Sequence, residues 1–275
     1  MAIFDNIFGQ GSGPDPWIEK GKASFGQGKY EEARRHFDKA LELNDNNPGI
    51  HYLRGQALFN LGDMRGAEAS FRRCVAMVPD DIPSWEALGA ALMREGNYEG
   101  AIECHDRVLA AKKADLHTSL QKVRCLEHLG SYARAASLME DVAALQPDDM
   151  AFREEAGRLA LIAGNFADAS SHFAAVLKFR PDDAHLLASA AEAAQKKGDN
   201  EAAADLYRRA IAAEPEDRGT TMRLALLYDM LGRHSDAAEA YRKVQLADPD
   251  NPTAGFLPGR VPLLPGRLPR VHPGS

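Results

Sequence analysis

Apolar and polar positions repeat along this chain with a period of 34 residues, and inside each period the apolar positions recur at helical spacing. Each period contains two such runs of roughly fifteen residues, the first ending at a glycine and the second near a proline. Residues three and four apart lie on one face of a helix, so each period predicts two amphipathic helices joined by a tight turn. The chain is therefore expected to be all-α.

Glycine and alanine fix the register of this repeat. The glycines lie 34 residues apart, at Gly28, Gly62, Gly96, Gly130, Gly164, Gly198 and Gly232. Five residues after each glycine stands an alanine, at Ala33, Ala67, Ala101, Ala135, Ala169, Ala203 and Ala237. We expect each glycine to end a first helix in a left-handed or crowded conformation, which costs glycine least.

Small and large side chains alternate around each glycine in a fixed order. Seven residues before it the residue is small in six repeats, at Gly21, Gly55, Gly89, Gly157, Ala191 and Ala225, with Val123 differing. Nine residues after it the residue is large in six, at Phe37, Phe71, Met139, Phe173, Tyr207 and Tyr241, with His105 differing. The small residues let the two helices approach closely, and the large ones fill the space between neighbours.

The second helix of most repeats is followed by proline and acidic residues, as in "PDD" and "PED". Proline stops a helix, and a following aspartate can cap the next one. Calcium loops need a 12-residue array ending in glutamate, which is absent, so helix capping explains these acids.

This order of residues resembles the tetratricopeptide repeat family, whose 34-residue unit has the same small, glycine, alanine, aromatic and proline positions. The resemblance covers residues 14–251 as seven repeats: 14–47, 48–81, 82–115, 116–149, 150–183, 184–217 and 218–251. It implies an α-solenoid, a right-handed superhelix of helix-turn-helix repeats. Departures gather in the third and fourth repeats, at His105, Lys113 and Val123, so we expect a hinge or an altered superhelical step near residues 110–117.

The resemblance also implies that the first helices line a concave surface that binds peptide segments of partner proteins. In the family, five places of each repeat face that surface: the second, fifth, ninth, twelfth and thirteenth. Here they give an apolar N-terminal zone and a basic middle zone. The predicted peptide-binding residues are Ile18, Lys22, Phe25, Tyr52, Gln56, Phe59, Arg94, Arg124, His128 and Arg158. This set favours an acidic peptide with an apolar anchor. The alternative for the aromatic side chains is ordinary packing between repeats, and the alternative for the arginines is a solvated or ion-paired position on the surface.

The function predicted is a non-enzymatic protein–protein interaction scaffold. Two alternatives stay open: a targeting module of a larger enzyme, such as a transferase or kinase, truncated after residue 251, and a self-assembling structural protein. A chaperone-binding carboxylate clamp is disfavoured, because no three consecutive repeats carry the lysine, asparagine and arginine set of such family members.

Charge and cysteine content narrow the class of protein. A net charge of -7 argues against a nucleic-acid partner, which needs a concentrated basic surface. The cysteines Cys74, Cys104 and Cys125 form no paired motif, so they favour buried thiols in a reducing compartment. No apolar stretch is long enough to cross a membrane, and no secretory signal is present. These features predict a cytoplasmic protein with no integral membrane association.

The segment "ECHDR" places Cys104, His105 and Asp106 side by side. Adjacent residues on a helix point about 100° apart, so they cannot form a catalytic relay, and we interpret His105 as a core or half-buried histidine in the aromatic position. The nine histidines contain no pair at i, i+4 and no HExxH motif. We therefore predict no metal and no cofactor.

The two ends depart from the repeat. Residues 1–13 carry Ile3, Phe4, Ile7 and Phe8 at helical spacing before a Gly/Ser link. They predict a flexible or short amphipathic segment that could cap the stack, touch a membrane or dock in another copy's groove, which makes a homo-oligomer possible. Residues 252–275 are rich in proline, glycine and arginine and predict a disordered tail, with translation from a non-native reading frame as the alternative.

Overall fold

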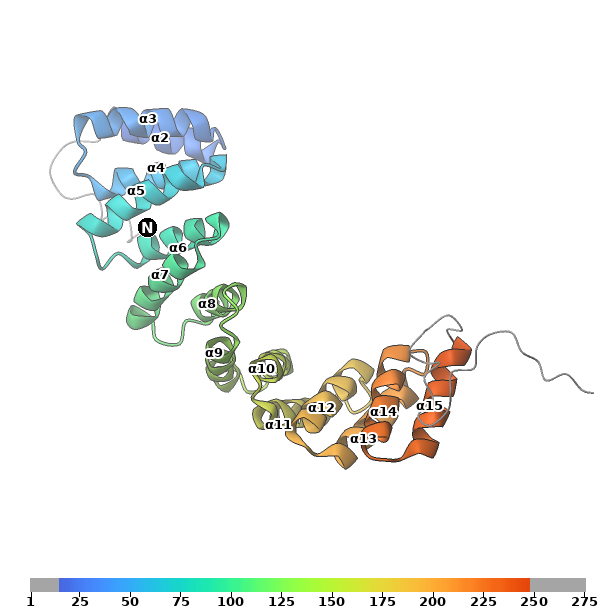
Figure 1. Cartoon of the computed structure of the whole chain (residues 1–275). Coiled ribbons are helices and arrows are strands. Elements are labelled where there is room, and N and C mark those ends of the chain that lie inside the picture. The colour runs from blue at the N-terminus through green and yellow to red at the C-terminus, as the bar shows by residue number, and fades with distance from the viewer. Residues whose placement is uncertain (1–14, 248–275) are drawn as a thin grey trace, which may run out of the picture. The chain divides into compact units, whose positions relative to one another are not determined.

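The computed structural model describes residues 15–247, and over that range the chain consists of helices joined by short turns, with no strand (Figure 1). The all-α prediction is confirmed. The predictions for residues 1–13 and 252–275 fall outside the described residues.

The chain divides into two compact bodies, Met1–Gln146 and Pro147–Ser275, called here the N-terminal and C-terminal bodies. The N-terminal body contains α2 (Pro16–Gly26), α3 (Tyr30–Leu43), α4 (Pro48–Leu61), α5 (Met64–Met77), α6 (Ile82–Glu95), α7 (Tyr98–Ala111), α8 (Leu116–His128) and α9 (Tyr132–Leu145). The C-terminal body contains α10 (Met150–Ala163), α11 (Phe166–Leu177), α12 (Ala184–Lys197), α13 (Asn200–Ala213), α14 (Arg218–Met230) and α15 (His234–Ala247).

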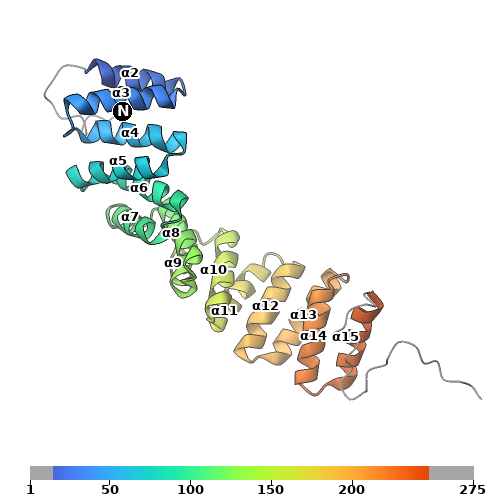
Figure 2. The ribbon, with the colours of Figure 1, turned by 45° about the horizontal axis from the view of Figure 1, so that its top comes forward.

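Within each body every helix packs on the helices before and after it in sequence (Figures 1 and 2). In the N-terminal body the first helices also touch one another, since α2 contacts α4 and α4 contacts α6. This arrangement is the stacked helix-pair fold that the repeat predicted. The handedness of the stack remains a prediction.

The seven periodic glycines all have left-handed backbone. Their φ angles lie between +66° and +95°, and each follows the last turn of a first helix. A Cβ added at any of them would meet no atom within 4 Å, so conformation and not crowding selects glycine there. The prediction that these glycines end the first helices is confirmed.

The small residue earlier in the first helix lies under the large side chain of the second helix. A Cβ placed on Gly55 would come within 2.6 Å of the Phe71 ring, and Gly21 and Phe37 meet in the same way at 2.4 Å. Both rings are almost completely buried, and the periodic alanines are all 0% exposed. The close approach predicted from the sequence is confirmed.

The acidic residues between repeats cap helices. The side chain of Asp81 accepts a hydrogen bond from the Ser84 amide at 3.1 Å, and Asp183 accepts one from the Leu186 amide at 3.0 Å. These bonds satisfy amides that a helix start leaves without a partner. The capping interpretation is confirmed for these turns.

The irregular junction of the third and fourth repeats has a local backbone signature. Ala114, next to the lysine that replaces proline, has φ +66°, the one positive φ outside glycine in residues 15–247. The junction nevertheless lies inside the N-terminal body, where α7 packs on α8. The chain divides into its two bodies one repeat later, between Gln146 and Pro147, and the hinge or altered superhelical step at the junction stays a prediction.

Two glycines in the first repeat should respond oppositely to alanine. Gly28 has φ +74°, whereas Gly26 closes α2 with ordinary backbone, and neither has a neighbour within 4 Å of an added Cβ. We expect Gly28→Ala to lower the free energy of unfolding by about 1–2 kcal/mol. Gly26→Ala should raise it by about 0.5 kcal/mol, because alanine favours the helix. Urea unfolding followed by circular dichroism measures both, and changes of equal sign would contradict the interpretation.

Gly55→Ala tests the close approach. The added methyl group would overlap the Phe71 ring, so we expect a loss of about 1–3 kcal/mol in the free energy of unfolding. The loss should be smaller in a Phe71→Leu background, where the ring is absent. A double-mutant cycle measures this coupling, and simple additivity of the two changes would show that the contact does not set the spacing.

Candidate functional site

Two adjoining hollows open along the first helices of the N-terminal body. Phe59 of α4 and Ala90 of α6 line both, so the hollows share a wall. Together they are called here the groove. Most of its lining comes from α2, α4, α6 and α8, the helices that the resemblance placed on a concave surface.

The aromatic hollow has a volume of about 210 Å³ and lies across α2, α4 and α6. Its lining residues are Phe25, Gln56, Phe59, Asn60, Phe71, Ala87 and Ala90. The Phe25 ring is held by Tyr30 in an edge contact at 5.2 Å between ring centroids. Three phenyl rings make this hollow suited to an apolar side chain, and the amides of Gln56 and Asn60 at its rim can hydrogen-bond a peptide backbone.

The histidine hollow is larger, about 290 Å³, and continues from Phe59 towards α8. Its lining residues are Phe59, Glu86, Ala90, Met93, Arg94, His105, His117, Thr118 and Gln121. The Arg94 guanidinium lies over the Phe59 ring, 4.3 Å from its centroid, so it stands beside the residue that lines both hollows. The Glu86 carboxylate pairs with Lys112 at 2.6 Å.

His105 and Cys104 lack the properties of a catalytic pair. Burial raises the pKa of the Cys104 thiol to about 12, so the nucleophilic thiolate is scarce at neutral pH. Burial also lowers the pKa of His105 to about 4, so its imidazole is neutral. His105 is 5% exposed, which confirms that it occupies the buried aromatic position.

Four of the predicted peptide-binding residues meet in the groove: Phe25, Gln56, Phe59 and Arg94. Three others from the first two repeats do not line it. Ile18 packs on the core around Phe37, and Tyr52 is half-buried with its ring 5.8 Å from that of Phe71. Lys22 pairs with Glu19 on its own helix at 3.1 Å.

The rest of the predicted basic zone lies outside the groove. Arg124 is exposed on α8, and the His128 ring stacks on Tyr98 with centroids 4.3 Å apart. Arg158 belongs to α10 of the C-terminal body and pairs with Glu155 at 2.5 Å. Arg94 is therefore the one residue of the predicted basic zone that lines the groove together with the apolar residues.

The groove also contains residues that the sequence prediction did not include. Asn60, Glu86, Ala90, Met93 and His117 occupy the same five places of their repeats, so reading all repeats evenly would have found them. Phe71 and His105 come from second helices, and the pattern of the first helices could not indicate them.

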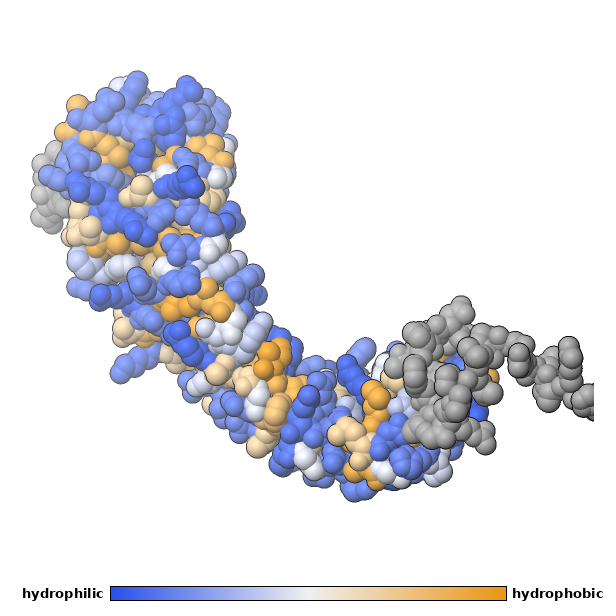
Figure 3. Space-filling model, viewed as in Figure 1, coloured by the Kyte–Doolittle hydropathy of each residue, from blue (hydrophilic) through white to orange (hydrophobic). Residues whose placement is uncertain are grey.

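No cluster of three metal-binding side chains occurs in the described part of the chain. Among the described helices, none combines the length and apolar character needed to cross a bilayer. On the face shown in Figure 3, hydrophilic residues predominate over each body and apolar residues surface in small patches.

Comparison with known proteins extends the evidence beyond the groove. Models described as tetratricopeptide repeat match residues 48–81, 84–119, 120–184 and 189–252, and one described as TPR repeat matches residues 21–62. A search of curated proteins finds no match.

Solved structures share the fold. The C-terminal part of a TPR repeat-containing protein from Cytophaga hutchinsonii is 20% identical with a TM-score of 0.60, over 86% of this chain and 97% of that one. Naa15/Naa10 bound to HypK-THB is 16% identical with a TM-score of 0.69, over 86% of this chain and 37% of that one. YrrB, titled a TPR protein with an unusual peptide-binding site, is 20% identical with a TM-score of 0.51, over 66% and 93%.

Family models thus match from residue 21 to residue 252, over the same helix pairs and left-handed glycines that the structure describes. The chain belongs to the tetratricopeptide repeat family.

Proposed function

We propose that this protein is a non-enzymatic scaffold that binds an extended segment of a partner protein in the groove of the N-terminal body. The observation that carries the proposal is the shared wall of the two hollows at Phe59 and Ala90. A single short segment can place one side chain in each hollow, which gives affinity and specificity together.

The aromatic hollow supplies the anchor. Phe25 and Phe59 are only half-buried, so part of each ring faces solvent in the free protein. Covering that area with an apolar side chain of the partner removes it from water, which is favourable by roughly 25 cal/mol per Å². Gln56 and Asn60 at the rim offer polar atoms to the partner's backbone.

The histidine hollow supplies a charge preference. Arg94 has its guanidinium over an aromatic ring and is exposed, whereas the nearby Glu86 is neutralised by Lys112. An acidic residue beside the apolar anchor of the partner fits this arrangement, because guanidinium groups bind carboxylates with good geometry. The partner class is therefore an acidic peptide segment with an apolar anchor.

Two solved structures of the same fold support a binding role. One is titled as bound to HypK-THB, and the other as having a peptide-binding site. The buried, protonated Cys104 and the unexposed His105 argue against hydrolytic or group-transfer chemistry in the groove.

Phe59→Ala tests the proposal directly. Random peptides about twelve residues long, displayed on phage, are selected on the immobilised full chain, and enriched peptides are measured by calorimetry. We expect Phe59→Ala to weaken their binding about tenfold or more, because the shared wall of both hollows is lost.

Phe179→Ala is the matched control, since Phe179 is 68% exposed and lies in the C-terminal body. It should leave the affinity unchanged. Failure to enrich any peptide, or equal affinities for the two variants with intact helicity, would contradict binding in the groove.

A further inference from the structure

His105 occupies a position that a purely apolar ring fills in other repeats. The equivalent residues of the first, second and fifth repeats are Phe37, Phe71 and Phe173, each buried against a glycine of the first helix. His105 lies against Gly89 in the same way, with its Cε1 3.1 Å from a Cβ built there. The imidazole is therefore packed as a phenyl ring would be.

The imidazole differs from a phenyl ring in having polar nitrogens, and one of them lacks a partner. The Nε2 atom of His105 is shielded from solvent and makes no hydrogen bond within the described residues. Polar groups at the same position in other repeats are satisfied: the Tyr207 hydroxyl donates to Gln195 at 3.3 Å, and the Tyr241 hydroxyl donates to Asp229 at 3.0 Å. A buried polar group without a partner destabilises the free protein, so phenylalanine would be the more stable residue here.

The location of His105 indicates what could compensate for this cost. Its ring lines the histidine hollow together with Thr118 and Gln121 of α8 and Arg94 of α6. Because Nε2 is shielded in the free protein, a bound segment has to displace the side chains over it before a polar group in the hollow can supply the missing hydrogen bond. The free-energy cost of the unpaired nitrogen is then present in the free protein and removed in the complex.

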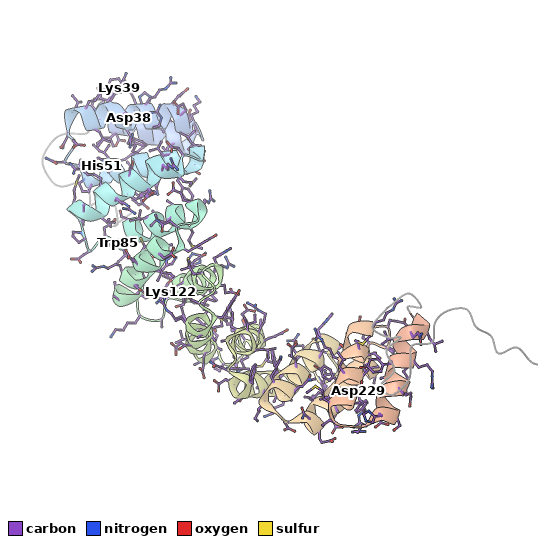
Figure 4. The ribbon with its side chains drawn as sticks, in the orientation of Figure 1. Asp38, Lys39, His51, Trp85, Lys122 and Asp229 are labelled. Carbon is purple, nitrogen blue, oxygen red and sulfur yellow. The ribbon has the colours of Figure 1, made fainter. Side chains whose placement is uncertain are left out.

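The charged groups around the imidazole select the kind of polar group. The charge of Asp106, the next residue on α7, acts on the imidazole, but Asp106 is paired with Lys122 of α8 at 2.5 Å (Lys122 is labelled in Figure 4). From α6, Glu86 is paired with Lys112, and Arg94 contacts the Phe59 ring. His117 of α8 lines the same hollow and is exposed. Both carboxylates are thus neutralised, and the guanidinium is left to attract an anion.

Resting on the proposed binding in the groove, the geometry points to His105 as a specificity residue: it hydrogen-bonds the carboxylate of a partner's aspartate or glutamate side chain, whose neighbouring apolar residue fills the aromatic hollow. Arg94 supplies the opposite charge at the mouth of the hollow. His105 donates from a ring N–H, and the carboxylate oxygen accepts.

Binding of this kind should be linked to protonation. Burial lowers the pKa of His105 to about 4 in the free protein, and a bound carboxylate would raise it, because the opposite charge stabilises imidazolium. A group whose pKa rises on binding takes up a proton in the complex, so affinity should increase as the pH falls towards the raised pKa.

The first test compares the peptides selected by two forms of the full chain. On the wild-type protein, the random library should enrich aspartate or glutamate at a fixed distance from a large apolar residue. His105→Phe should keep the apolar preference and lose the acidic one, because the phenyl ring fills the position without a polar atom. His105→Met is a second variant in case the phenyl ring perturbs folding, because methionine occupies the equivalent position of the next repeat, at Met139.

Thermal unfolding separates a specificity role from a structural one. His105→Phe should raise Tm by about 2 °C or more, since an unsatisfied buried nitrogen is removed, while the affinity for the wild-type acidic peptide falls about tenfold. A lower Tm in both variants, or an acidic preference unchanged in both, would overturn the inference. Absence of any enriched peptide on the wild-type protein would instead contradict the proposed function itself.

The second test uses the enriched peptide and its counterpart with glutamine in place of the acid. Between about pH 7.5 and about pH 5.5, a rise of two units in the pKa of His105 strengthens wild-type binding of the acidic peptide about fourfold. The glutamine peptide and the His105→Phe variant should show no such gain. His117→Asn controls for the exposed imidazole, and this variant should keep the gain in affinity at low pH. If the gain is lost in His117→Asn but kept in His105→Phe, then His117 takes up the proton and the inference is refuted.

Discussion

The contact between a residue without a side chain and a buried ring sets the spacing of the helices in this protein. At Gly21 and Gly55 the ring of the second helix lies so close that even a methyl group would overlap it. Where the small residue is alanine, as at Ala191 and Ala225, the ring is a tyrosine whose hydroxyl finds a partner. Where it is Val123, the larger position holds the adaptable Met139. The helix pairs thus fill the space between their helices with four combinations of residues: glycine with phenylalanine, glycine with histidine, alanine with tyrosine, and valine with methionine.

This spacing creates the groove. The first helices of neighbouring repeats come into contact, α2 with α4 and α4 with α6, and the two hollows lie along them. Phe59 lies at the meeting point of these helices and lines both hollows. The groove is a consequence of stacking and needs no loop or insertion to form.

His105 shows how a polar residue can take a buried aromatic position without disturbing the stack. An imidazole has almost the shape of a phenyl ring, so it enters the buried position against Gly89 without changing the helix spacing. The change costs stability, of the order of 1–3 kcal/mol for an unsatisfied buried polar group, and adds a hydrogen-bonding atom to the groove. Proteins commonly tolerate such local losses where a ligand supplies the missing partner.

The helix pairs, their turns and their caps could be predicted from the residues alone, because these features depend on interactions between residues close together in the chain. Glycine at each turn adopts a left-handed backbone that other residues avoid, and an aspartate such as Asp81 binds the amides at the start of the next helix. The buried alanines and the large side chains followed from the same period. Four residues that line the groove, among them Phe59 and Arg94, followed from the family's places on the first helices.

The tertiary structure alone decided which side chains share a hollow. Tyr52 and Ile18 occupy the same kind of place as Phe59, yet they pack against the core rings, whereas Phe71 and His105 reach the groove from second helices. Charge pairing was also invisible in the sequence, since Glu86 lies 26 positions from the lysine that neutralises it. Side-chain exposure and charge pairing depend on neighbours one repeat away, and the 34-residue period predicts the contacts inside a helix pair but not those between side chains of neighbouring repeats.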